Sequence, residues 1–197
     1  MGKRLKSQLL RAYEDVLISR FSSKFEKGHT DGYVLDIGQS FFMLARIDDS
    51  KKFDGFECRR IEDMRKIKVP APYATFALEA LRKQKQMIRK KPDVSLDSLP
   101  EILESANKIF PIVTIFTEEL KPNCCWIGKV VELTPRHLTL HKIGPDAIWH
   151  DSPTKYRLSE ITRVDFGGGY ERALYLVGGN PSPMKGKAKQ KHGKKAG

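Results

Sequence analysis

The chain has 197 residues, of which 40% are apolar and 30% charged, as is typical of a globular protein of one domain or two small ones. It contains no apolar run of membrane-spanning length, and the first residues match neither a secretory signal nor a myristoylation motif. Three cysteines cannot form a disulfide framework, so we expect a cytoplasmic protein with no membrane partner.

The net charge of +12 is spread unevenly. Residues 181–197 contain six lysines, no acidic residue, and no bulky apolar residue except Met184. Such a segment cannot bury enough apolar surface to offset the entropy lost on ordering, so we expect a disordered lysine-rich tail. In the rest of the chain, residues 1–91 are net basic and residues 92–180 are net acidic.

The first half of the chain predicts a helix, a series of short strands and a second helix. Apolar residues at helical spacing between Leu5 and Tyr13 indicate the first helix. Alternating apolar and polar residues then predict strands near 15–22, 29–37, 40–47, 55–60 and 64–69. A longer helix is expected over Tyr73–Lys90, with basic residues in its last turns.

The second half repeats this order. Ser98, with Pro100 in the first turn, predicts the start of a helix. Strands are expected near 111–118, 124–133, 136–143, 155–158 and 161–166, followed by a short helix over Tyr170–Leu176. Three glycines, Gly167–Gly169, lie between the last strand and this helix, in a position where many proteins bind phosphate.

An internal repeat organises the chain. The segment GYVLDIGQSFFMLARI (32–47) matches GKVVELTPRHLTLHKI (128–143) at an offset of 96 residues, and 59–78 matches 156–175 at an offset of 97. The repeat predicts a first domain over 1–91 that ends in a helix, a linker over 92–97, a second domain over 98–180, and the tail over 181–197.

The alignment also assigns structural roles. Gly32 and Gly128 are expected where the second strand of each unit bends sharply, because glycine tolerates close backbone approach. The two cores are expected to contain Val34, Leu44, Ile47, Ile67, Val130, Leu140, Ile143 and Val164. Gly167–Gly169 aligns with Pro70–Ala71–Pro72, and prolines offer no N–H to a phosphate. We therefore interpret the glycines as a turn from strand to helix, with Tyr170 and its counterpart Tyr73 packed back at the helix start.

A helix followed by five short bent strands, with a tight turn between the last two, resembles the Sm-like fold, a small SH3-type barrel. The segments GYVLDIG and GKVVELT look like the first half of an Sm signature, and ITRVDFGGGYERAL resembles a motif of a little-characterised group of bacterial proteins. The resemblance implies a mainly β fold with helices, built from two tandem Sm-like barrels.

The same resemblance carries over no RNA-binding residue. Sm proteins that bind uridine-rich RNA use an Asp and then an Asn in the turn after strand two, and an Arg-Gly between strands four and five. Here Asp36 is present, but Gly38–Ser40 contains no Asn. The segments RIED and LSEI stand where the Arg-Gly turn would be.

Metal binding and catalysis find little support in the sequence. The cysteines and histidines lack paired zinc-ligand spacing: Cys58, Cys124, Cys125, His29, His137, His141 and His150. Asp48, Asp49 and Asp54 lack the spacing of a calcium loop. His150–Ser152 places a His, an Asp and a Ser side by side, which rarely gives triad geometry, and we interpret this segment as a loop anchored by Trp149. No metal, cofactor or enzymatic activity is expected.

Two functions remain open. The first is a non-enzymatic interaction or scaffold module that pairs edge strands with a protein partner or with its own copies. The second is binding of single-stranded nucleic acid such as RNA, with Phe41, Phe42 and Phe53 as stacking faces. Its candidate cationic residues are Arg59, Arg60, Arg82, Lys83, Arg89, Lys90, Lys91, Lys185, Lys187 and Lys189.

Overall fold

The computed structural model describes residues 2–88 and 90–182. The tail expected over 181–197 therefore lies outside the described residues, except for its first two positions. No described helix is long and apolar enough to cross a membrane.

The first unit of the chain consists of two helices and five strands. Its elements are α1 (Lys3–Glu14), β1 (Ser19–Ser23), β2 (Thr30–Ile37), β3 (Phe41–Ile47), β4 (Phe53–Arg60), the 3-10 turn η1 (Ile61–Asp63), β5 (Met64–Lys68) and α2 (Ala74–Lys83). The five strands lie where the alternating sequence pattern predicts them, with β1 starting four residues later than expected.

The second unit repeats this order. Its elements are α3 (Leu99–Ile109), β6 (Val113–Phe116), β7 (Cys125–Leu133), β8 (His137–Lys142), β9 (Thr154–Arg157), the 3-10 turn η2 (Leu158–Glu160), β10 (Arg163–Phe166) and α4 (Gly169–Gly178). Helix α3 begins as predicted, because the Ser98 hydroxyl accepts a hydrogen bond from the Glu101 amide at 3.4 Å.

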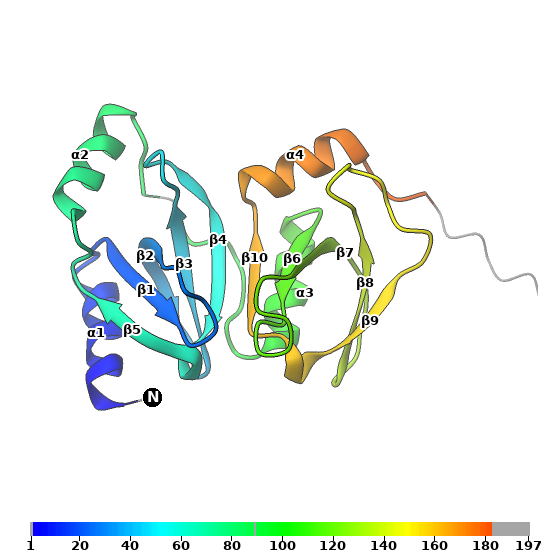
Figure 1. Cartoon of the computed structure of the whole chain (residues 1–197), viewed down its shortest axis with the longest axis horizontal. Coiled ribbons are helices and arrows are strands. Elements are labelled where there is room, and N and C mark those ends of the chain that lie inside the picture. The colour runs from blue at the N-terminus through cyan, green and yellow to red at the C-terminus, as the bar shows by residue number, and fades with distance from the viewer. Residues whose placement is uncertain (1, 89, 183–197) are drawn as a thin grey trace, which may run out of the picture.

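All ten strands form one antiparallel sheet in the order β5-β1-β2-β3-β4-β10-β6-β7-β8-β9. Figure 1 shows the two units side by side, with β4 and β10 adjacent at the centre. The expectation of two tandem barrels is not confirmed, because the sheet is open. The physical reason is that β4 pairs with a strand of the other unit, while β5 pairs only with β1 among the described strands.

The two units correspond in register as well as in order. Each has a bulge in its second strand, after Val34 in β2 and after Val130 in β7. A Cβ on Gly32 would lie 2.4 Å from the Ala45 carbonyl oxygen, and one on Gly128 would lie 2.1 Å from that of His141. Another backbone therefore approaches closely at both glycines.

The turn between β2 and β3 has the same backbone hydrogen bond as the turn between β7 and β8. The Gly38 amide donates to the Phe41 carbonyl at 2.8 Å, and the Thr134 amide donates to the His137 carbonyl at 2.9 Å. The internal similarity of the sequence is thus also present in the backbone hydrogen bonds of the two units.

Helix α2 ends at Lys83, seven residues before the end that its sequence predicts. Lys85 adopts a left-handed backbone with φ of 56°. The amides of Lys85 and Gln86 donate back to the carbonyls of Arg82 and Leu81. This is the Schellman arrangement that usually requires glycine, so a lysine at this position conceals the helix end in the sequence.

The tyrosines before α2 and in the first turn of α4 do not pack back, contrary to expectation. Tyr73 is 81% exposed and Tyr170 is 55% exposed. Tyr73 also adopts a left-handed backbone, which directs the chain into α2.

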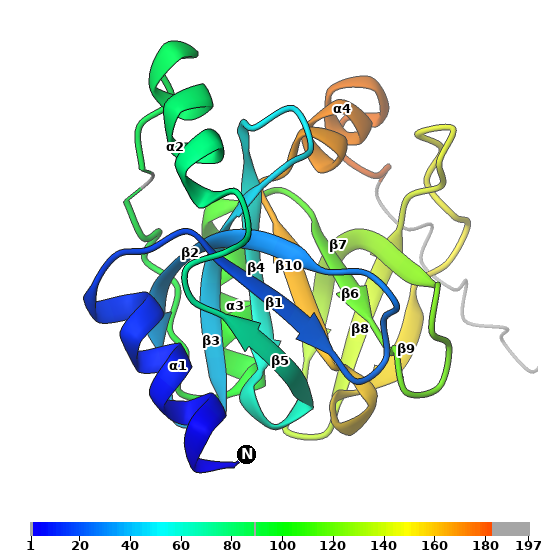
Figure 2. The same cartoon turned by 60° about the vertical axis from the view of Figure 1, so that its left-hand side comes forward.

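The largest core cluster extends through both units rather than filling one barrel. It combines Phe41, Met43, Phe56 and Cys58 of the first unit with α3 and the strands of the second. The expected linker also contributes, because Val94 and Leu96 are buried in this cluster. Helix α1 packs on β2 and β5, and α3 packs on β6 and β7 (Figure 2).

The predicted core residues are buried, except that Val130 is only partly so. Leu140→Ala is expected to lower the free energy of unfolding by about 2–4 kcal/mol, because it leaves a cavity beside α3. Urea denaturation of the two proteins measures the loss. An unchanged midpoint would contradict the placement of Leu140 in the core.

Candidate functional site

The junction between the units is a pair of strands with two chemically different faces. Strand β4 pairs with β10 in the register Cys58↔Val164, Phe56↔Phe166, Arg59↔Arg163 and Glu57↔Asp165. The first two pairs belong to the apolar core, where the rings of Phe56 and Phe166 lie 5.8 Å apart. The other two pairs place four charged side chains on the opposite face.

On the first unit's side of the junction, the charged side chains gather around Arg59. Its guanidinium donates to Glu57 at 2.8 Å, to Glu26 at 2.7 Å and to the Thr30 hydroxyl at 2.8 Å. The side chain is 2% exposed, so these bonds form away from water. A buried guanidinium has lost its hydration, so removal of any of these partners would destabilise the fold.

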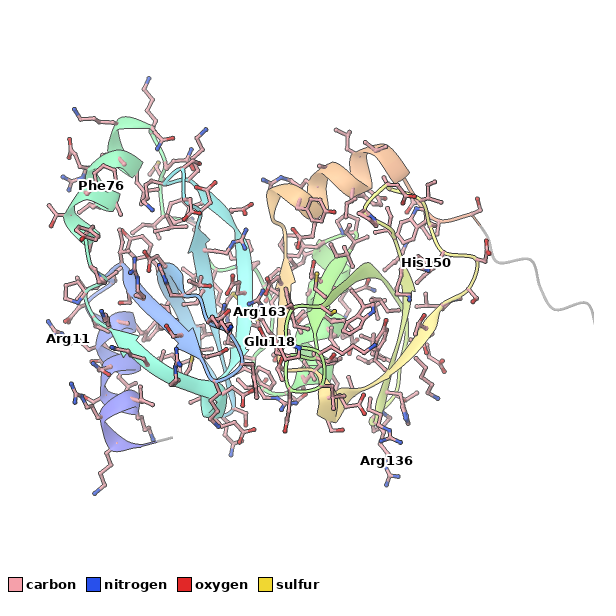
Figure 3. The ribbon with its side chains drawn as sticks, in the orientation of Figure 1. Arg11, Phe76, Glu118, Arg136, His150 and Arg163 are labelled. Carbon is pink, nitrogen blue, oxygen red and sulfur yellow. The ribbon has the colours of Figure 1, made fainter. Side chains whose placement is uncertain are left out.

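Arg163 carries the network into the second unit. Its guanidinium lies 3.5 Å from Glu26, 3.4 Å from Glu118 and 3.0 Å from Asp165, and it stacks 3.6 Å above the ring of Phe116. Figure 3 shows Arg163 and Glu118 close together between the two units. Glu26 contacts arginines from both units and so links them electrostatically.

Asp165 is the least compensated acid of the network. Its Oδ1 lies 3.0 Å from the Nε of Arg163, but the angle does not allow a hydrogen bond, and both atoms are buried without one. Burial and the nearby negative charge of Glu57 outweigh the attraction of Arg163 and raise the pKa of Asp165 to about 8. Burial also opposes ionisation of Glu57, but the surrounding arginines lower its pKa.

The glycine-rich loop belongs to the same junction. The amide of Gly169, at the start of α4, donates to the carboxylate of Asp54 in β4 at 2.6 Å, and Arg46 pairs with that carboxylate. Burial would raise the pKa of Asp54, but these hydrogen bonds outweigh it and lower that pKa. A carboxylate of the chain itself thus occupies the helix N-terminus where a phosphate would bind.

Close backbone contact with this loop explains the glycine at position 55 of β4. Gly55 has φ of 75°, and a Cβ there would lie 2.5 Å from the Gly168 nitrogen. Gly55→Ala is expected to destabilise the protein by about 1–3 kcal/mol, because it forces β4 away from the loop and strains the backbone. Thermal unfolding measures this loss. Gly28→Ala is the matched control, since its added methyl group meets open space.

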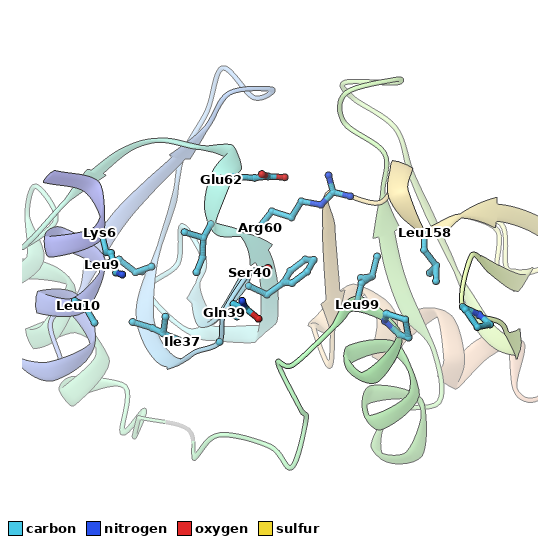
Figure 4. A pocket seen from close by; sticks show the side chains of 15 residues that line it. Lys6, Leu9, Leu10, Ile37, Gln39, Ser40, Arg60, Glu62, Leu99 and Leu158 are labelled. Carbon is cyan, nitrogen blue, oxygen red and sulfur yellow. The ribbon is translucent and has the colours of Figure 1, made fainter. Parts of the chain in front are cut away.

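The turns of the two units meet in a groove of about 720 Å³. Its floor is apolar, and its lining residues come from α1, the turns after β2 and β7, the two 3-10 turns, and the start of α3. Lys6, Gln39, Ser40, Arg60 and the acidic Glu62 supply polar groups along it (Figure 4). Arg60 also bridges the units, because it donates to the Ser159 carbonyl at 2.8 Å.

The structure does not bring the predicted nucleic-acid residues together. Arg59 is buried in the ion network, whereas Arg60 lines the groove. Arg82 and Lys83 are exposed on α2, at the other end of the first unit in Figure 1. Lys90 is exposed, and Lys91 pairs with Asp36 at 2.6 Å. The remaining candidates, Arg89, Lys185, Lys187 and Lys189, lie outside the described residues.

The residues considered for base stacking, metal binding and catalysis are not arranged for these functions in the described part of the chain. Phe41, Phe42 and Phe53 are buried, and Phe41 lines the groove between the units. Within the described residues, no group of three or more His, Cys, Asp or Glu side chains is placed to hold a metal ion. In the loop of His150, the indole of Trp149 donates to the Gly178 carbonyl at 3.1 Å and anchors the loop to the end of α4.

The two free edges of the sheet are basic. Strand β5 exposes Arg65, Lys66 and Lys68, and β9 exposes Lys155 and Arg157. Strand β5 also has a bulge in its pairing with β1, and β9 is only four residues long. Cations, bulges and short strands all limit uncontrolled pairing at an edge.

Comparison with known proteins adds no relative. No family model matches the sequence, no curated protein matches it, and no solved structure matches the chain. The function is therefore inferred from the site alone.

Proposed function

We propose that the chain is a non-enzymatic interaction module built from two Sm-like units, which recruits other chains by strand addition at the free edges β5 and β9. The observation that carries this proposal is the pairing of β4 with β10, because it joins two complete five-stranded units edge to edge. The same mode of association is open to β5 and β9, which lack a second neighbour among the described strands.

The Sm-like assignment rests on the correspondence of the two units. Each has the strand order fifth-first-second-third-fourth, a preceding helix, a bulged second strand and a 3-10 turn before the fifth strand. Small units of this type are widely used as building blocks of assemblies, and this role needs no catalytic residue.

Sedimentation velocity at several protein and salt concentrations tests the proposal. We expect association of the full chain to increase with salt, because salt screens the cations on both edges. Lys155→Pro, which removes one backbone donor from β9, should keep the chain monomeric. The proposal would be refuted if the original chain and Lys155→Pro sediment equally under all conditions and if no added chain or peptide binds at β9.

A second candidate function is binding of single-stranded nucleic acid in the groove between the units. The observation that favours it is the position of Lys6 and Arg60 beside an apolar floor between the two sets of turns. We expect binding of a labelled single-stranded RNA that persists after deletion of residues 181–197 and weakens about tenfold in Arg60→Ala. Arg82→Ala is the control. Loss of all binding on deletion would assign it to the tail.

A further inference from the structure

The two free edges differ chemically from the junction that the chain forms internally. At the junction, the two arginines that lie opposite each other have carboxylate partners: Arg59 contacts Glu57 and Glu26, and Arg163 contacts Glu118 and Glu26. Strands β5 and β9 contain five basic residues and no acidic residue. The free edges therefore carry an excess of cations, although Arg157 lies 3.7 Å from Glu160 in the adjoining 3-10 turn.

The repeat shows what would happen if a second copy extended the sheet. At the offset of 97 residues, β9 corresponds to β4 and β5 corresponds to β10. Pairing of β9 with β5 of another copy in the register of the junction would place Arg65 opposite Arg157. Lys68 would stand where Asp165 stands in β10. Like charges directly opposite one another destabilise a pair of strands.

The hydrogen bonds of β9 show which of its backbone groups are free. The Leu158 amide donates to the Arg136 carbonyl at 3.0 Å at one end of the β8–β9 ladder. Antiparallel strands alternate between bonded and non-bonded pairs, so Tyr156 and Thr154 bond to β8. The N–H and C=O groups of Lys155 and Arg157 therefore point away from the sheet, and both of these cationic side chains are exposed.

We propose that β9 docks an extended acidic segment of a partner protein, which adds to the sheet as a further strand in preference to a second copy of this chain. The outward backbone groups of Lys155 and Arg157 supply the hydrogen bonds, and their side chains supply the charge complementarity. Edge lysines that keep copies of the chain apart attract an acidic strand for the same electrostatic reason. This inference rests on the proposed strand-adding function and specifies its partner.

The test uses the full chain and two labelled peptides of about ten residues, in which valine alternates with glutamate or with lysine. We expect fluorescence anisotropy to show binding of the acidic peptide at low salt. Binding should weaken about tenfold in the double variant Lys155→Glu, Arg157→Glu, and the lysine peptide should bind that variant in preference to the original chain. The matched control, Arg82→Glu with Lys83→Glu on α2, makes the same charge change and should bind the acidic peptide normally.

Hydrogen exchange at single-residue resolution gives an independent readout. The acidic peptide should slow exchange at the amides of Lys155 and Arg157. Equal binding to the β9 and α2 variants, or no protection of these amides, overturns the inference. So does stronger protection of the same amides by single-stranded RNA, which would assign β9 to nucleic acid. If the peptide fails but the chain self-associates in a Lys155-dependent way, the proposed function stands and only the acidic partner is refuted.

Discussion

Arg59→Met is expected to lower the free energy of unfolding by about 3–5 kcal/mol, because the substitution leaves the buried Glu57 and the partly buried Glu26 without their main cation. Burial opposes ionisation of Arg59 itself, but the surrounding carboxylates outweigh that effect and raise its pKa, so the guanidinium stays charged at every accessible pH. Methionine retains most of the volume and removes the charge. The loss is measured by urea denaturation at neutral pH.

The neighbouring arginine provides the control. Arg60 is half-buried and makes one hydrogen bond, to the Ser159 carbonyl, so Arg60→Met should cost less than about 1 kcal/mol. Combining Arg59→Met with Glu57→Gln should recover part of the lost stability, because the second change removes the negative charge that Arg59 no longer compensates. Equal losses in Arg59→Met and Arg60→Met would contradict the buried network.

The sequence predicts the elements of this fold well, because their signals are local. Strand alternation places all ten strands, and Ser98 marks the start of α3. The spacing of Gly32 and Gly128 within the repeat predicts two close backbone contacts. The end of α2 is missed because a lysine, Lys85, adopts the left-handed conformation that normally signals glycine.

The junction cannot be predicted in the same way, because its residues are far apart in the sequence. Glu26 and Arg163 are separated by more than a hundred residues, and nothing near either residue indicates the other. The segment RVDF does contain a signal in retrospect. Its alternation of apolar and charged residues, repeated in FECR of β4, indicates strands with one core face and one charged face.

Differences between the repeats also record which edges are paired. Cys58 lies in a paired edge and faces the core, whereas its counterpart Lys155 lies on a free edge. Asp165 is buried in the junction, whereas its counterpart Lys68 is exposed on the other free edge. At these positions the repeats diverge because an unpaired edge needs charge to remain soluble and a paired edge needs packing.

Asp165→Asn is expected to remove most of the pH dependence of stability between about pH 5 and pH 8. In the folded chain the pKa of Asp165 is raised to about 8, and its unfolded value is near 3.8. The folded state therefore holds a proton that the unfolded state releases, so stability falls as the pH rises through this interval. The asparagine variant should therefore be the more stable of the two proteins at pH 8.

The comparison with Asp54→Asn isolates this effect. The pKa of Asp54 is lowered by Gly169 and Arg46, so its contribution is present above its unfolded pKa and is lost only in acid. Asp54→Asn should therefore destabilise the chain by a similar amount at every pH from 5 to 8.

Urea denaturation across this pH range measures the stability of all three proteins. Parallel curves for the original chain and Asp165→Asn would show that Asp165 is ionised throughout and that Arg163 compensates its charge fully. Curves that diverge as the pH rises would instead show that the junction between the units contains a carboxyl group that is neutral when folded. The charged and titratable groups that interact with this carboxyl group are Arg163, Glu57 and Arg59 on the paired strands, Glu171 on α4 and Cys125 on β7.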